Sequence, residues 1–387
     1  MFSRRHSLRK SREETLDLFM KGWNFSDEAL SIMRRGFFGD EAGIGDATGM
    51  IDNQPFDLGL NAALAEMEMI IYTVTEDALK AAQVKPSEVD ILITAADTYV
   101  PVPSMSAMIA NRFKMRSDVR TYSLAGHSCT SGIIVVELAQ QLLKAAKGKV
   151  ALLVLHTNCT AGFSRSNLKP CCASNVLFRL NGAALVLSNR SKDKQRAKYE
   201  LMCTERVLLT SDAAHNSIKI REDGEGQTGV FLAREDLLAA AGESIKATLT
   251  KIAPRILPLA ELARLQSTPW AQAKAAWYKG YKPDIGKAFD HILIHTGAAT
   301  VISTVVRGLR LDPLAAVPSS ETLHRFGNTM LCSTYYILAN IESQNGVQKG
   351  DRILQLSFGA GFKCGAGFWR ALRDVKDAKH SAWDPYG

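Results

Sequence analysis

The sequence has no apolar stretch long enough to cross a bilayer. Its longest uninterrupted apolar runs, such as Ile133–Val136 and Val150–Leu155, are far shorter than the ~20 residues that a membrane-spanning helix needs. Basic residues and no acidic residue occur within the first twelve positions, but no apolar segment follows them. We therefore expect neither a transmembrane span nor a secretory signal.

Cysteine is scarce, and its seven copies are thinly spread along the 387 residues. Their odd number argues against a disulfide framework, and no CxxC pair or His/Cys cluster has the spacing of zinc ligands. We therefore expect reduced thiols and no metal site. The cysteines are at positions 129, 159, 171, 172, 203, 332 and 364.

Acidic residues are too few to balance the basic ones, since 47 Lys and Arg face 39 Asp and Glu and leave a net charge of +8. The basic residues are scattered, however, and no nucleic-acid-binding signature accompanies them, so we expect no nucleic-acid partner. With 46% hydrophobic and 22% charged residues, the chain is also unlike a disordered protein or a coiled coil.

Short β-rich segments alternate with longer helical patterns along the whole chain, which predicts an α/β fold of stacked layers. The first half and the second half share a strand–helix–strand order, which indicates two pseudo-symmetric halves. The expected strands are 90–95, 120–124, 150–156, 183–188, 291–295 and 352–358. The expected helices are 59–82, 104–113, 130–146, 235–252, 298–308 and 329–342.

Five segments follow from this pattern. Residues 32–190 and 191–373 form the two halves, and the proline-containing stretch 253–287 is expected to be a cap or lid outside the core. Residues 374–387 are a polar tail. Residues 1–31 carry Leu16, Phe19, Trp23 and Phe25 among basic residues, which indicates either an ordinary surface helix or a segment that lies on a membrane surface.

Cys129 lies in AGHSCTSG, directly after an expected strand and before an expected helix. A thiol at a helix N-terminus faces unpaired N–H groups and the positive end of the helix dipole, which lower its pKa and favour the thiolate. Cys129 is therefore a candidate nucleophile. The alternative is a buried structural cysteine, a common environment for a free thiol.

His295 ends the expected strand HILIH, so its ring should lie at the carboxyl edge of a sheet, where sites in α/β proteins form. Asn328 and His324 belong to LHRFGNT, which we interpret as a loop that leads into a helix. Each residue alone has an ordinary explanation, and Asn328 in particular would suit a helix N-cap.

Together, a helix-start cysteine, a strand-end histidine and a loop asparagine suit thioester chemistry. The thiolate would accept an acyl group, while neutral His295 and the amide of Asn328 donate hydrogen bonds to an enolate. Glycines in FGAGF, namely Gly359 and Gly361, would let a backbone N–H approach the acylated cysteine and complete an oxyanion hole.

These residues give the sequence its resemblance to the 3-ketoacyl-CoA synthases of very-long-chain fatty acid elongation, plant and algal type, within the thiolase-like superfamily. The resemblance runs from about residue 32 to about residue 373. The matching segments are PSMSAMIANRFKMRSDVR (103–120), the Cys129 motif, NVLFRLNGAALVLSNR (175–190), HILIHTGA (291–298), TLHRFGNT (322–329), KGDRILQLSFGAGFKC (349–364) and WRALR (369–373).

The resemblance implies a thiolase-like α-β-α-β-α fold and an acyltransferase. Cys129 would carry a long-chain acyl group, His295 and Asn328 would promote decarboxylation of malonyl-CoA and condensation, and His291 and His324 would have supporting roles. It implies the substrates acyl-CoA and malonyl-CoA, no metal or redox cofactor, a homodimer, and elongase partners such as reductases and a dehydratase. It also implies the cytosolic face of the endoplasmic reticulum membrane, although this chain has no span of its own.

Two departures from the family keep other readings open. His127 and Ser128 precede Cys129 where the family has small or apolar residues, and Thr157 stands in place of a family glutamate. One alternative is an enzyme like the type III polyketide synthases, which would extend a primer repeatedly. Another is a catalytically degraded paralogue that binds acyl-CoA or an elongase partner as a scaffold.

Overall fold

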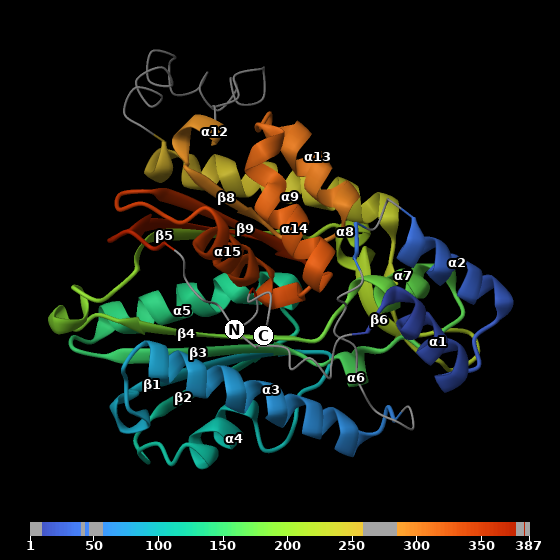
Figure 1. Ribbon diagram of the computed structural model, residues 1–387, viewed down its shortest axis with the longest axis horizontal. Coiled ribbons are helices and arrows are strands. Elements are labelled where there is room, and N and C mark those ends of the chain that lie inside the picture. Colours follow the sequence, from blue (N-terminus) through green and yellow to red (C-terminus); the bar gives the residue numbers. More distant parts are fainter. Residues whose placement is uncertain (1–9, 40–42, 46–56, 258–284, 377–382, 384–387) are drawn as a thin grey trace.

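The computed structural model describes the chain except residues 1–9, 40–42, 46–56, 258–284, 377–382 and 384–387. Its elements stack as helices, sheet, helices, sheet and helices (Figure 1). This is the layered α/β fold that the alternating sequence pattern predicts. Within the described residues, no helix has the length and apolar character to span a membrane.

The first sheet has the strand order β2-β1-β3-β4. β1 (Ile91–Asp97) runs parallel to β2 (Arg120–Ala125) and β3 (Val150–Thr157), whereas β4 (Asn181–Ser188) is antiparallel to β3. Every residue of β1 and β3 is buried, because helices cover both faces of these central strands. Their nearly continuous apolar sequences are typical of strands in that position.

The second sheet has the order β5-β10-β9-β8. β8 (His291–Ile294) is parallel to β9 (Arg352–Gly359), and β10 (Lys363–Ala371) is antiparallel to β9 and to β5 (Tyr199–Leu208). The sequence pattern did not predict β5, β10 or the hairpin of two further strands. That hairpin consists of β6 (Ile218–Glu222) and β7 (Thr228–Leu232).

Two helices lie between the sheets, α5 (Ser131–Ala145) and α15 (Ser333–Gln344) (Figure 1). They approach closely because Gly132 has no side chain: a Cβ there would lie 2.6 Å from the carbonyl oxygen of Leu331. The outer layers are made by longer helices on the far faces of the sheets. These are α3 (Leu60–Ala81) and α4 (Met105–Arg112) below the first sheet, and α9 (Arg234–Ile256), α12 (Ile285–Ala288) and α13 (Ala299–Leu309) above the second.

The two halves repeat one arrangement. In each half, two parallel strands flank a central helix in sequence and an antiparallel strand follows, as β1–α5–β3–β4 and as β8–α15–β9–β10. A short 3₁₀ turn precedes each central helix, Ser128–Thr130 before α5 and Met330–Cys332 before α15. The pseudo-symmetry therefore brings two equivalent turns together at the centre of the molecule.

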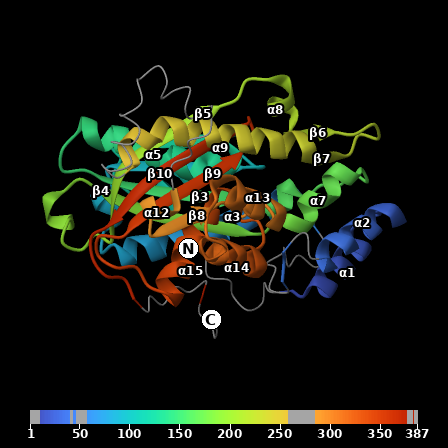
Figure 2. The same cartoon turned by 90° about the horizontal axis from the view of Figure 1, so that it is seen from above.

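The two N-terminal helices pack on the body of the fold. α1 (Arg12–Gly22) begins at Ser11, whose side chain forms a capping box with Glu14, and α2 (Asp27–Phe38) crosses the boundary expected at residue 31. Leu16, Phe19 and Phe25 are buried. Figure 2 shows both helices at one end of the molecule, beside α7 (Lys169–Leu177). Their apolar faces are used in packing against the rest of the fold.

The ends of the predicted cap at 253–287 belong to the core. Residues 253–256 continue α9, and Ala253 and Ile256 are buried in the cluster between this helix and the second sheet. Ile285 and Ala288 of α12 join the same cluster. The prolines did not end the helix where expected, because Pro254 is accommodated inside its last turn. Residues 258–284 lie outside the described part of the chain.

Candidate active site

Cys129 occupies the 3₁₀ turn that leads into α5, with 6% of its surface exposed. The Oγ of Ser357, on β9, donates a hydrogen bond of 2.5 Å to the carbonyl oxygen of Cys129. Gly359, at the end of the same strand, lies against the cysteine: a Cβ on it would be 2.9 Å from the Cys129 nitrogen. The second sheet thus fixes the backbone of the candidate nucleophile.

The free thiol is not activated by its helix, contrary to the expectation from the sequence. Burial raises the pKa of Cys129 to about 12, and the negative charge of Asp97 raises it further. The Ser128 hydroxyl, which donates to Sγ at 3.6 Å, lowers the pKa of Cys129 but does not offset burial. Burial therefore disfavours the thiolate of the free chain.

His295 directly follows β8 and is 2% exposed. Burial lowers its pKa to about 3, so the imidazole is neutral at physiological pH. Its ring packs edge-on against Phe358, with 5.3 Å between the ring centroids. Nδ1 has no hydrogen-bond partner among the residues that the structure describes. A buried imidazole with an unused nitrogen is suited to accept or donate a proton.

Asn328 is buried, at 4% exposure, between α14 (Val317–Phe326) and the second central turn. Its Oδ1 accepts from the N–H of Met330 at 2.8 Å, and its Nδ2 donates to the carbonyl oxygen of Gly297 at 3.3 Å. Asn328 is therefore not the N-cap of α15, which begins only at Ser333. These two bonds fix the amide orientation and use one of the two N–H groups.

These three side chains are linked indirectly, through contacts with residues that lie between them. Gly359 touches Cys129, while Phe358, its neighbour in β9, packs on His295. Gly297, two residues after His295, accepts the hydrogen bond from Asn328. The structure thus gathers the residues at the carboxyl ends of β8 and β9 and beside the starts of both central helices, where sites in α/β folds form.

The supporting histidines lie elsewhere. His291 is at the opposite end of β8 from His295, and its Nε2 pairs with Oδ2 of Asp351 at 2.9 Å. This pair links the starts of β8 and β9, at the opposite ends of these strands from the site. His324 is in the last turn of α14 rather than in the expected loop, and its side chain is exposed and packs against Gly45.

The two glycines of FGAGF have different surroundings. Gly359 makes room for Cys129, as predicted. Gly361 has φ of +135°, a conformation that other residues rarely adopt, and a Cβ on it would meet the side chain of Lys363 at 2.9 Å. Gly361 thus shapes the turn between β9 and β10 and contacts a lysine rather than the cysteine.

Three neighbours of Cys129 were not identified as site residues from the sequence. Ser128 and Ser357 contact the cysteine itself, and Asp97, at the end of β1, accepts from the Ser128 N–H at 3.2 Å. The position of Asp97 at the carboxyl end of a buried strand is a signal that could have indicated it. Within the described residues, no group of His, Cys, Asp and Glu side chains has a metal-binding arrangement.

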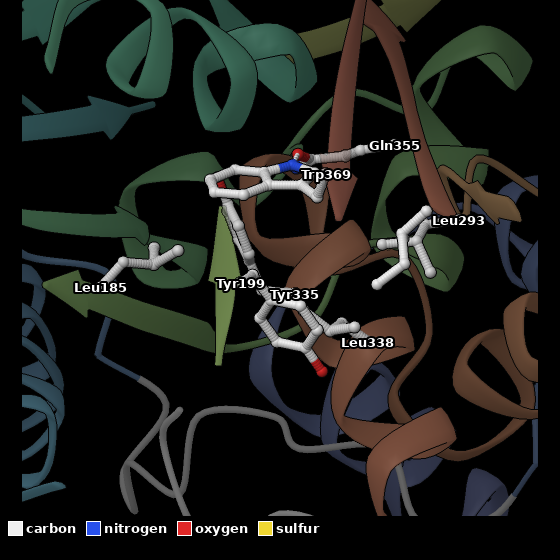
Figure 3. Close-up of a pocket in the computed structure, with 8 residues that line it drawn as sticks. Leu185, Tyr199, Leu293, Tyr335, Leu338, Gln355 and Trp369 are labelled. Carbon is white, nitrogen blue, oxygen red and sulfur yellow. Dashed lines mark hydrogen bonds between the residues drawn. The ribbon is translucent and has the colours of Figure 1, made fainter. Parts of the chain in front are cut away.

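An apolar pocket lies on the face of the second sheet that α15 covers (Figure 3). Its one amide is Gln355, whose Oε1 accepts from Trp369 Nε1 at 2.9 Å. Gln355 shares a face of β9 with Ser357, so the pocket lies about 7 Å along the strand from the Cys129 contact. Its lining consists of Leu185, Tyr199, Leu293, Tyr335, Leu338, Ile353, Gln355 and Trp369, and includes none of the three gathered residues.

Comparisons with known proteins agree with this architecture. Residues 1–273 match the family described as FAE1/Type III polyketide synthase-like protein, and residues 286–371 match the C-terminal part of 3-oxoacyl-[acyl-carrier-protein] synthase III. The chain is 35% identical over 366 residues to 3-ketoacyl-CoA synthase 4 of Arabidopsis thaliana, with 93% of this chain and 70% of that protein covered. It is 36% identical over 380 residues to probable 3-ketoacyl-CoA synthase 20 of Oryza sativa subsp. japonica, with 97% and 72% covered.

Solved structures share the fold. A polyketide synthase from the brown alga Ectocarpus siliculosus superposes with a TM-score of 0.73 at 15% identity, covering 94% of this chain and 95% of that one. The 1,3,6,8-tetrahydroxynaphthalene synthase of Streptomyces coelicolor A3(2) gives a TM-score of 0.70 at 19% identity with the same coverages. The Streptomyces protein is a type III polyketide synthase, and the algal protein is named as a polyketide synthase. The likeness to them identifies the layered fold as the thiolase-like one.

Proposed function

The chain belongs to the 3-ketoacyl-CoA synthases, condensing enzymes of very-long-chain fatty acid elongation, and from this premise we propose that Cys129, His295 and Asn328 are its catalytic residues. The observation that supports this assignment best is their arrangement: all three are buried, and Gly359, Phe358 and Gly297 connect them. The sequence motifs offered no second set of cysteine, histidine and asparagine for this chemistry.

In the first half-reaction, Cys129 takes the acyl group from acyl-CoA. The neutral imidazole of His295 accepts the thiol proton as the sulfur attacks the thioester carbonyl, because an imidazolium could not act as a base. The new C–S bond forms, the bond to the CoA sulfur breaks, and the proton passes to the leaving CoA. We propose the backbone N–H of Cys129, next to Gly359, as the donor to the oxyanion.

In the second half-reaction, malonyl-CoA loses CO₂. The electrons of the broken C–C bond move into an enolate, whose oxygen accepts hydrogen bonds from the imidazole N–H of His295 and the second N–H of Asn328. The enolate carbon then attacks the thioester on Cys129. Collapse of the tetrahedral intermediate releases the sulfur and gives a 3-ketoacyl-CoA that is two carbons longer.

This reaction requires no metal or redox cofactor, and we propose that the enzyme uses none. Acyl-CoA and malonyl-CoA supply every atom of the product, and the thioester supplies the activation. Activity that survives dialysis against a chelator is the expected result. Loss of activity that returns only with added metal would contradict this part of the proposal.

We also propose a homodimer formed through β2. This strand is at the edge of the first sheet, and its residues are largely exposed, which leaves backbone groups free to pair with a second copy. The nearby Val100 and Val102 are 59% and 98% exposed. Light scattering after size-exclusion chromatography should give twice the monomer mass, and Thr121→Pro should give the monomer mass.

The proposed location is the cytosolic face of the endoplasmic reticulum membrane, together with the reductases and dehydratase that process a 3-ketoacyl-CoA. Family membership supports this location and these partners. Fractionation of cells that express the tagged full chain, followed by crosslinking, tests both. A protein that fractionates with soluble markers and crosslinks to none of these enzymes would contradict it.

The decisive assay supplies purified protein with saturated acyl-CoA primers of C16 to C24 and labelled malonyl-CoA. We expect one 3-ketoacyl-CoA product per primer, two carbons longer, and no product with Cys129→Ser. Several malonyl additions per primer would instead favour a polyketide synthase-like activity. Absence of product together with absence of an acyl adduct on Cys129 would favour the scaffold alternative.

A further inference from the structure

Ser128 contacts the sulfur of the candidate nucleophile directly. Its Oγ donates to Sγ of Cys129 at 3.6 Å, within range for a hydrogen bond to sulfur. Ser128 has φ of +51°, in the left-handed region that a residue with a side chain occupies at a cost in free energy. The surrounding structure therefore holds Ser128 in a conformation that its own backbone does not favour.

Asp97 is one of two groups that hold it; the other is Ser131, whose Oγ donates to the carbonyl oxygen of Ser128 at 2.7 Å. The carboxylate accepts the Ser128 N–H at Oδ1 with a distance of 3.2 Å and also accepts the N–H of Gly126. Asp97 is 7% exposed, and its Oδ2 has no hydrogen-bond partner among the described residues. Burying a carboxyl oxygen that accepts no hydrogen bond costs free energy. The position of Asp97 beside this turn therefore needs a functional explanation.

The reaction requires a donor at the sulfur. A thiolate in this buried place needs hydrogen bonds, because burial alone disfavours the charged form. His295 is neutral and cannot supply the positive charge of an imidazolium before it accepts the proton. The Ser128 hydroxyl is already in place to donate.

We propose that the Ser128 hydroxyl is the hydrogen-bond donor that stabilises the thiolate of Cys129, and that Asp97 is the positioning residue that holds Ser128 for this role. This inference rests on the proposed function of Cys129. Ser128 touches the reacting atom and is therefore a catalytic residue, whereas Asp97 acts through Ser128.

The charge of Asp97 has a second, opposing effect. Burial raises the pKa of Asp97 to about 7, and once ionised it disfavours the nearby thiolate. Lys363 of β10 acts electrostatically on Asp97, and Asp97 acts in turn on Cys129 and Cys332. Lys363 in turn interacts with Arg206 of β5, and both cations face His127. The carboxylate thus helps by geometry and hinders by charge, and the two contributions can be separated.

The test measures the rate at which iodoacetamide alkylates Cys129, followed by peptide mass spectrometry between pH 6 and pH 9 in the full chain. Because the pKa of Cys129 lies far above this range, the rate at any pH reports the thiolate fraction. We expect Ser128→Ala to lower the rate about tenfold at every pH, a change of about one unit in thiol pKa. Ser128→Gly should do the same, although glycine relieves the backbone strain.

Asp97 is tested with two substitutions. Asp97→Asn keeps an oxygen for the Ser128 N–H and removes the charge, so alkylation should become faster above pH 7. Asp97→Ala removes the acceptor, so alkylation should become slower. Asp90→Asn, at the other end of β1, is the matched control and should leave the rate unchanged.

The outcomes are distinct. Wild-type rates in both Ser128 variants would overturn the role of Ser128, and equal slowing in Asp97→Asn and Asp97→Ala would overturn the positioning role of Asp97. Condensation assays run in parallel separate this inference from the proposed function. Product formation by Cys129→Ser would overturn the function itself, whereas loss of product there with unchanged alkylation in Ser128→Ala would overturn only the inference.

Discussion

Gly359 and Cys129 are in direct backbone contact across the boundary between β9 and the first central turn. A Cβ on Gly359 would lie 2.9 Å from the nitrogen of Cys129 and 3.0 Å from its Cβ, distances that real side chains do not tolerate. Neither neighbour can give way easily, because Ser357 also fixes the carbonyl of Cys129. The position of the sulfur therefore depends on the absence of one methyl group.

Gly359→Ala should displace Cys129 and slow its acylation at least tenfold, since a displacement of about 1 Å in a catalytic group can cost a factor of ~100. The rate of acyl-adduct formation from acyl-CoA, followed by intact mass, measures this. Gly308→Ala is the matched control, because a Cβ there meets nothing within 4 Å in α13. It should leave acylation unchanged and stabilise the helix by about 0.5–1 kcal/mol. Normal acylation in Gly359→Ala would contradict the importance of this contact.

Asn328→Ala should separate the two half-reactions. Its Nδ2 is proposed to stabilise the enolate, which forms only after acylation, so the adduct on Cys129 should still appear while condensation falls about 100- to 1,000-fold. Rapid-quench measurement of adduct and product shows the two steps. A matched loss of both steps would indicate instead that Asn328 supports the fold, where its Oδ1 holds the turn at Met330.

The buried His295 should make stability depend on pH. Its pKa is lowered to about 3 in the folded chain, so below the unfolded value of about 6.5 the unfolded state binds a proton that the folded state does not. Its contribution is therefore present above pH 6.5 and is lost as the pH falls toward 3. Relative to His295→Gln, the wild type should lose about 2 kcal/mol of unfolding free energy between pH 7 and pH 5.

Urea denaturation of both proteins at pH 7 and pH 5 measures this difference. A comparison at pH 7 and pH 8 is the control, because the folded state does not titrate this residue there and the unfolded state, with a pKa of about 6.5, has only about a quarter of a proton left to release. His156 and two buried carboxyls, Glu66 and Asp97, also have shifted pKa values, but they remain in both proteins. A difference that stays constant from pH 7 to pH 5 would show that His295 is accessible to protons in the folded state.

The N-terminal helices should be integral to stability. Phe19 is fully buried and packs on Phe37 and Phe163, with ring centroids 6.0 and 5.1 Å away. Phe19→Ala should lower the free energy of unfolding by about 3–5 kcal/mol. Its neighbour Met20 is 47% exposed, and Met20→Ala should change the free energy of unfolding by less than about 0.5 kcal/mol. Equal effects of the two substitutions in thermal melts would contradict this packing.

The sequence predicts much of this fold because its central strands are apolar on both faces. The strands at 91–97 and 150–157 and the helices around them are within a few residues of the prediction. β10 was missed because Gly365 and Gly367 interrupt its apolar pattern and weaken the strand signal. β5 is at the edge of its sheet and pairs with β10, more than 150 residues later in the sequence. Such pairing leaves little local trace.

The site could be predicted by residue type but not by electrostatic environment. Motifs pointed to Cys129, His295 and Asn328, each of which contacts a residue at or just beyond the carboxyl end of β8 or β9. The sequence led us to expect an acidic thiol because it shows a helix start but not the burial that opposes it. Asp97 was missed for a related reason: its contact with Ser128 spans 31 residues and depends on how two strands align.

The packing of α2 connects the N-terminal helices to Asn328. The guanidinium of Arg179 lies over the ring of Phe37, 5.5 Å from its centroid. The backbone N–H of Arg179 donates to the backbone carbonyl oxygen of Asn328 at 3.2 Å. A fragment that begins near residue 32 would cut through α2 and keep Phe37, but it would lose Phe19, which packs on the Phe37 ring. Inactivity of such a fragment would then report a damaged support rather than a missing targeting segment.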